Sequence, residues 1–229
     1  MAVTELDLRA AQIAIAEWWF FGSQFSNNAS PGSGTPAQAP GNHGTRGNES
    51  MPGFKERVWS YFKIGCFPDS NGWTALKTEP WSAAFISFCM RQGGAGNQFP
   101  YSPSHAIYVM SAVRNRLAGR LTNVIAAYDR TEMAPTVGDL LWQGRSSPGN
   151  PIDTTGWTYN DLINHVQGDG RTFPSHCDLV VDVDVNNGLL LAIGGNVKNT
   201  VFRVREKLDA GGRLVNNVHT VVIKNNITE

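Results

Sequence analysis

The stretch HCDLVVDVDVNNGLLLAIGGN, residues 176–196, decides the fold. Valines alternate with aspartates as far as Val185, and a second apolar run begins at Leu189 after an Asn-Asn-Gly turn, which predicts a β-hairpin. Apolar side chains should share one face of the hairpin, so we expect a three-residue loop that pairs Val185 with Leu189. Extended outward, this register places Asp178 opposite Asn196.

Outside this hairpin, predicted helices come first and predicted strands come later. Apolar residues at three- and four-residue spacing predict helices at 4–21, 52–65, 78–93 and 105–117. Short apolar runs predict strands at 139–143, 177–185, 189–194, 201–205 and 218–224. This order predicts an α+β fold with N-terminal helices packed on an antiparallel sheet. We expect a single domain over 1–229, with a long flexible loop at about 23–52.

Composition excludes several functions. The 229 residues carry 19 Lys+Arg and 19 Asp+Glu, and this balance offers no field to attract nucleic acid. The three cysteines, Cys66, Cys89 and Cys177, form neither a disulfide framework nor a zinc motif. No apolar stretch reaches the roughly 20 residues of a membrane span. Acidic residues at the N-terminus argue against a signal peptide, so we expect synthesis in the cytoplasm without one.

A candidate catalytic pair consists of one residue at the start of the third predicted helix and one residue in the hairpin. With Thr78 as the N-cap and Pro80 in the first turn, Ser82 lies near the helix N-terminus, where unpaired N–H groups favour an oxyanion. A serine nucleophile needs a neighbouring base, and His176 is the candidate. The predicted register places His176 on the same face as Asp178 and Asn196. The alternative is that these residues are structural.

Two other chemistries remain open from the residues alone. In one, Cys177 or Cys89 is the nucleophile, although buried structural cysteine is the preferred interpretation of both. In the other, His105, His176 and Asp178, with Glu79 as a further candidate ligand, bind a divalent metal that activates water.

Four motifs occur in an order that is typical of one family. They are PWSAAFISF at 80–88, Pro135 followed by GDL at 138–140, HCDLV at 176–180 and GGN at 194–196. Together they resemble the CHAP and NlpC-type branch of papain-like peptidoglycan hydrolases over roughly residues 52–205. The chain is also similar to a subgroup that includes type VI secretion cell-wall effectors, through AIAEWWFFG at 14–22 and SPSH at 102–105.

The resemblance implies a papain-like domain that hydrolyses an amide bond in peptidoglycan, as an endopeptidase or amidase, with no cofactor. It implies that Ser82 is the nucleophile, where the family has cysteine, that His176 is the base, and that Asn196 or Asp178 orients the imidazole. Substrate contacts are then expected from the following residues: Glu79, Trp81 and His105.

The resemblance also implies an antibacterial effector that acts in the periplasm of a target bacterium. Its expected partners are peptidoglycan, an immunity protein and components of a secretion apparatus. The alternative to an enzyme is a catalytically inactive module that binds the cell wall or a partner protein.

Overall fold

The strands form one mixed sheet in the computed structural model, which describes residues 2–25, 37–38, 46–68 and 80–228. Within these residues the strand order is β2-β1-β7-β6-β5-β4-β8-β3, and neighbours are antiparallel except for the parallel pair of β1 and β7. The bounds are β1 Gln24–Phe25, β2 Ala37–Gln38, β3 Ile125–Asp129, β4 Leu140–Gly144, β5 Ser175–Asp184, β6 Leu189–Val197, β7 Thr200–Lys207 and β8 Val221–Asn225.

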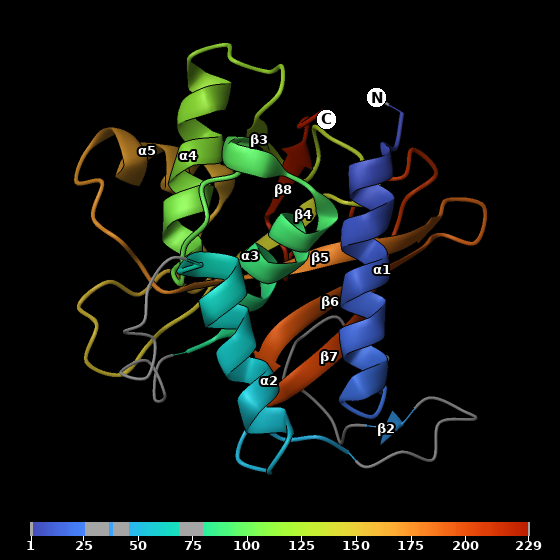
Figure 1. The fold of residues 1–229 in the computed structure, drawn as a ribbon. Helices are drawn as coiled ribbons and strands as arrows, with labels where there is room; N and C mark the ends of the chain where they lie inside the picture. The colour runs from blue at the N-terminus through green and yellow to red at the C-terminus, as the bar shows by residue number, and fades with distance from the viewer. Residues whose placement is uncertain (1, 26–36, 39–45, 69–79, 229) are drawn as a thin grey trace.

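The helices precede most of the strands along the chain, so the predicted α+β class is confirmed. Helices α1 and α3 pack against β5 and β6, and α4 packs against β3 (Figure 1). The helical elements are α1 Glu5–Phe20, α2 Phe54–Ser60, the π-helix η1 Tyr61–Cys66, α3 Ser82–Gly93, the 3₁₀ helix η3 Gly96–Gln98, α4 His105–Leu117 and α5 Tyr159–Gln167.

Both faces of the sheet are apolar. One buried cluster joins the helices to the sheet and includes Leu179 and Ile193. A second cluster lies on the opposite face and includes the adjacent residues Val180 and Ala192. Successive side chains of a strand point to opposite faces, so β5 and β6 are buried on both sides.

This two-sided burial explains why the predicted hairpin register is wrong. Asp184 pairs with Leu189 across a four-residue connection. Further along the strands, a bulge at Val181 shifts the register between the pairs Asp182–Leu191 and Val180–Ala192. The register rule assumed that only one face is apolar. Because both faces are buried, the bulge can move an apolar side chain from one face to the other without exposing it to solvent. Val185, which was expected to pair with Leu189, instead lies in the turn and is 44% exposed.

The helix predictions succeed where local signals are strong. Helix α4 has the predicted bounds, and α1 begins after Thr4, whose hydroxyl accepts from the N–H of Asp7 in a capping box. The predicted helix at 52–65 is α2 continued by η1. Helix α3 starts at Ser82 rather than near residue 78, and Trp81, with φ −100° and ψ 5°, is its N-cap. Thr78, the predicted cap, lies outside the described residues.

The GDL motif forms a turn whose aspartate binds residues of β8. Gly138 has φ +91°, and a Cβ there would lie 2.2 Å from the carboxylate of Asp7. Asp139 accepts hydrogen bonds from the backbone N–H of Thr136 at 2.6 Å and of Asn225 at 2.9 Å. Lys224 forms a buried ion pair with the same carboxylate. The motif is therefore structural in this fold.

The predicted loop at about 23–52 is described only in part. Strands β1 and β2 pair at the edge of the sheet within it, and residues 26–36 and 39–45 lie outside the described residues. The described helices include none that is both long and apolar enough to cross a membrane.

Candidate active site

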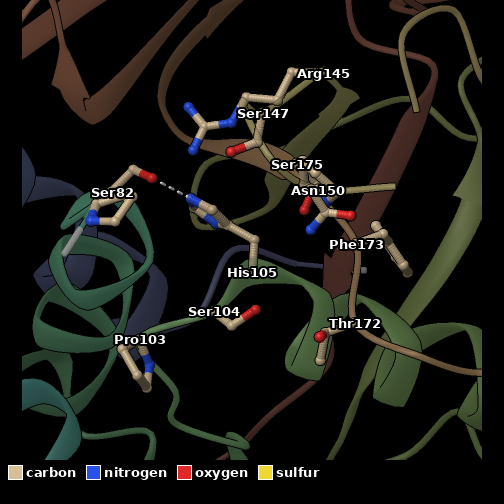
Figure 2. Close-up of a pocket in the computed structure, with 12 residues that line it drawn as sticks. Ser82, Pro103, Ser104, His105, Arg145, Ser147, Asn150, Thr172, Phe173 and Ser175 are labelled. Carbon is tan, nitrogen blue, oxygen red and sulfur yellow. Dashed lines mark hydrogen bonds between the residues drawn. The ribbon is translucent and has the colours of Figure 1, made fainter. Parts of the chain in front are cut away.

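A serine and a histidine meet where two helices begin. Ser82 is the first residue of α3 and His105 is the first residue of α4. The Oγ of Ser82 lies 2.7 Å from Nε2 of His105, as the dashed line in Figure 2 shows. Both side chains are buried, with 1% and 4% of their surface exposed. A serine hydroxyl at this distance from an imidazole is arranged to transfer its proton.

Another serine fixes the distance between the two helices. Ser87, one turn further along α3, donates from its hydroxyl to the carbonyl of Ser102 at 3.0 Å and accepts from the N–H of Ser102 at 3.1 Å. The hydroxyl of Ser102 in turn accepts from the N–H of Ser104, the N-cap of α4, at 3.0 Å. This chain of hydrogen bonds joins the middle of α3 to the start of α4, and so holds the Ser82–His105 pair in place.

The environment of His105 keeps its imidazole neutral. Burial lowers the pKa of His105 well below its usual range, and the neighbouring His176 and Arg145 lower it further. The hydroxyl of Tyr108 contacts Nδ1 of His105. In the tautomer that carries its proton on Nδ1, His105 donates to Tyr108, and Nε2 is free to accept the proton of Ser82. A neutral imidazole is the form that a general base requires.

A buried charged network lies directly beneath this pair. The ring of His176 packs edge to face against His105, with centroids 5.4 Å apart. Its Nε2 lies 3.0 Å from one carboxylate oxygen of Asp178, and Nε2 of His219 lies 2.8 Å from the other. Nδ1 of His219 lies 2.7 Å from the carboxylate of Glu206. Asp178, His219 and Glu206 are all 0% exposed.

The two carboxylates hold His219 in its charged form. Burial alone would lower the pKa of His219, but hydrogen bonds to Asp178 and Glu206 raise it to about 9. Burial likewise would raise the pKa of Asp178, and His176 and His219 outweigh burial and lower it. His219 is therefore an imidazolium at neutral pH, with both ring N–H groups donating to carboxylates.

The GGN motif supplies space for this network. A Cβ at Gly194 would lie 1.9 Å from Asp178 and 2.8 Å from Nε2 of His176, so only glycine fits. Asn196 turns the chain with φ +56°. Within the described residues no hydrogen bond joins Asn196 to a histidine, because the true register puts Gly194, and not Asn196, beside Asp178. Of the two residues predicted to orient the imidazole of His176, the structure places Asp178 and not Asn196 in contact with it.

A pocket of about 350 Å³ opens beside the Ser82–His105 pair (Figure 2). The start of α3, the start of α4, the end of β4 and the start of β5 contribute to its wall. The lining residues are Pro80, Ser82, Pro103, Ser104, His105, Arg145, Ser147, Asn150, Thr172, Phe173, Pro174 and Ser175.

The remaining predicted site residues that the structure describes do not lie where the sequence analysis placed them. The hydrogen bond of Ser82 goes to His105 and not to the predicted base, His176, because β5 presents His176 behind His105. Trp81 is 2% exposed and packs on Phe21 in the core, away from the pocket. Glu79 lies outside the described residues.

The described residues contain no group of three or more His, Cys, Asp or Glu side chains arranged to hold a metal ion. Both carboxylate oxygens of Asp178 are instead engaged by histidines. The alternative ligand set of His105, His176 and Asp178 thus has no support from this geometry.

The cysteines are poor candidates for the nucleophile. Burial raises the pKa of Cys66 to about 12, and raises those of Cys89 and Cys177 well above their usual range. Cys89 and Cys177 are fully buried in the core between the helices and the sheet. This agrees with the structural interpretation of both thiols.

Sequence reasoning missed Tyr108, Arg145, Glu206 and His219. Glu206 stands in a run of alternating charges, a pattern typical of a solvated strand edge. His219 belongs to no motif that would mark it as a site residue. The pairing of β5 with β6 and of β6 with β7 brings Glu206 toward Asp178, and the pairing of β5 with β4 and of β4 with β8 brings His219 there.

A protein-family model described as "Uncharacterized protein conserved in bacteria (DUF2272)" matches residues 7–226. The chain belongs to this family. The matched region of the DUF2272 chain includes every residue of the pocket and of the charged network. No curated protein and no solved structure matches the chain.

Proposed function

We propose that this DUF2272 protein is a serine hydrolase that cleaves an amide bond. The observation that carries the proposal is the 2.7 Å contact between Ser82 Oγ and His105 Nε2 at the wall of a pocket. His105 replaces His176 as the proposed general base, because His105 makes the contact with the hydroxyl.

In the first half of the reaction, Ser82 Oγ attacks the substrate carbonyl while its proton passes to Nε2 of His105. The tetrahedral oxyanion forms beside the first turn of α3, where the N–H groups of Ala83 and Ala84 have no partner within the helix. Collapse of this intermediate breaks the C–N bond. The departing amine takes the proton from His105, and the acyl group stays on Ser82 as an ester.

In the second half, water replaces the amine. His105 accepts a proton from the water as its oxygen attacks the ester, and then returns the proton to Ser82 Oγ as the carboxylic acid product leaves. Each half passes through an imidazolium at His105. Asp178 raises the pKa of His105 in opposition to burial, and so stabilises this charged form.

The substrate we propose is peptidoglycan, and its support is the sequence resemblance of the four motifs. The finer fold assignment, a papain-like domain, belongs to the same proposal. It is supported by a nucleophile at the start of a buried helix that packs on an antiparallel β5–β6 hairpin, and by a histidine–carboxylate pair on β5. The base on α4 departs from that pattern.

The proposal is tested by digesting purified peptidoglycan and analysing the products for new amino and carboxyl termini. The Ser82→Ala and His105→Gln variants should each lose activity by on the order of 10³-fold or more, since either change removes the proton transfer. Ser60→Ala, which removes a hydroxyl from α2 outside the pocket, should digest at the wild-type rate.

A fluorophosphonate probe offers a readout that needs no substrate. It should label the wild type and Ser60→Ala, and leave Ser82→Ala unlabelled. Full digestion by Ser82→Ala would refute the proposal. Absence of both digestion and labelling in the wild type would also refute it and favour a binding module.

The place of action follows from the proposed substrate. We propose an antibacterial effector that acts in the periplasm of a target cell, where an immunity protein would be needed for protection. Expression with an added export signal should lyse Gram-negative host cells, whereas cytoplasmic expression should not. Harm confined to cytoplasmic expression would contradict a cell-wall target.

A further inference from the structure

The pocket carries one uncompensated positive charge. Among its described lining residues, Arg145 is the sole arginine or lysine, and neither aspartate nor glutamate is present. Burial lowers the pKa of His105, so the imidazole adds no charge at neutral pH. The wall of the pocket therefore has a net charge of about +1, and the remaining polar groups are neutral.

Arg145 is held in position but has no acidic partner. It follows the last residue of β4, and Thr154 accepts its backbone N–H at 2.9 Å and donates to its carbonyl at 3.0 Å. A Cβ at Gly144 would lie 1.8 Å from the carbonyl oxygen of Thr154, so the two segments are in close contact. Within the described residues, the buried Nε of Arg145 has no hydrogen-bond partner and the guanidinium forms no ion pair.

A second unpaired polar group lies beside it. Ser175 is the first residue of β5 and stands opposite Gly144 in the sheet. Its buried hydroxyl also lacks a hydrogen-bond partner in the described residues. Buried polar atoms are nearly always paired, and these two unpaired groups, at adjacent strand ends, both belong to residues that line one pocket, where each is available to bind a substrate group. Figure 2 shows the side chain of Arg145 extending toward the Ser82–His105 pair.

The structure assigns Arg145 and Ser175 to a subsite for a substrate carboxylate next to the reacting serine. A guanidinium binds the two oxygens of a carboxylate through a planar fork, and the serine hydroxyl can donate a further hydrogen bond. One positive charge matches a carboxylate monoanion better than a phosphate dianion. This inference rests on the proposed hydrolysis, and it narrows the substrate to peptides with a free carboxylate close to the scissile amide.

The test measures binding to Ser82→Ala protein, so that it does not depend on turnover. The two probes are a peptidoglycan stem tetrapeptide with free carboxylates and the same peptide with its carboxylates amidated, compared by calorimetry. We expect the free form to bind at least about tenfold more tightly. Adding Arg145→Gln should abolish this preference, Arg145→Lys should retain part of it, and Ser175→Ala should weaken it.

Arg120→Gln serves as the matched control, since Arg120 is an exposed arginine outside the pocket. It should keep the full preference for the free carboxylates. Equal binding of both peptides, no binding of either, or a preference that survives Arg145→Gln would overturn the assignment. Inorganic phosphate that displaces the peptide at lower concentration than acetate would also overturn it, in favour of a phosphate site.

The inference and the proposed function can fail separately. Carboxylate preference without any digestion of peptidoglycan by the wild type would leave the subsite standing and refute the hydrolase. Digestion that depends on Ser82, without any preference for free carboxylates, would support the hydrolase and refute the carboxylate subsite.

Discussion

Replacing His219 with glutamine should make the stability of the protein less dependent on pH. Between Asp178 and Glu206, the pKa of His219 rises from 6.5 to about 9. The folded protein therefore binds this proton more tightly than the unfolded chain does. The resulting stabilisation is fully present below about pH 6.5 and is lost as the pH rises through about 9.

The magnitude follows from the two pKa values. Each unit of difference corresponds to about 1.36 kcal/mol, so the contribution is about 3 kcal/mol at its maximum. All three side chains are buried, and solvent screening does not reduce this value. We expect His219→Gln to lose about 3 kcal/mol of unfolding free energy near pH 6, in addition to a pH-independent loss from altered packing. Near pH 9.5 only the packing loss should remain.

Urea denaturation followed by tryptophan fluorescence at both pH values measures this difference. His165→Gln is the control for loss of a histidine ring, because His165 contacts the backbone carbonyl of Arg171 and not a carboxylate. Glu206→Gln removes one of the two partners of His219 and should reproduce part of the effect. A His219→Gln deficit that is equal near pH 6 and pH 9.5 would show that His219 is not charged in the folded protein.

Two further results are expected. Lys224→Met should lower the unfolding free energy by roughly 3–5 kcal/mol, because it leaves the buried carboxylate of Asp139 without its cation. The double variant that also carries Asp139→Asn should recover part of this loss. No recovery would argue against the ion pair. The three cysteines should resist dithionitrobenzoate at about pH 8 in the native protein and react fully in guanidinium, since their thiols are protonated. Rapid labelling of a native thiol would contradict the raised pKa values.

The sequence predicted those parts of the fold that depend on local signals. The capping box at Thr4 and the apolar periodicity of α4 are recorded in neighbouring residues, so both helices were located to within one or two residues. The bulge at Val181 leaves no such signal, because an apolar residue is acceptable on either face of a sheet that is buried on both sides. Helix α5 and strand β3 were missed because their apolar patterns are short.

In the candidate site, too, the residues marked by local sequence could be predicted, and those that depend on tertiary packing could not. Ser82 could be proposed from its position at a helix start, which is a local property. Its hydrogen-bond partner could not, because His105 and His176 are equally plausible until the packing of α4 against β3 and β5 is known. The pairing of His176 with Asp178 was expected from their shared strand face, and it is present at 3.0 Å. The partners of Asp178 beyond His176 depend on strands whose order no local pattern specifies.

The hydrogen bonds that join α3 to α4 have a consequence for the order of folding. Ser82 and His105 are separated by 23 residues, and Ser87 and Ser102 by only 15, so these contacts close short loops. Asp178 and His219 are 41 residues apart, and Arg145 reaches the pocket only once β4 has joined the sheet. Short loops close at lower entropic cost and form sooner. We therefore expect Ser82 and His105 to come together early in folding, and the wall of the pocket at β4 and β5 to be completed last.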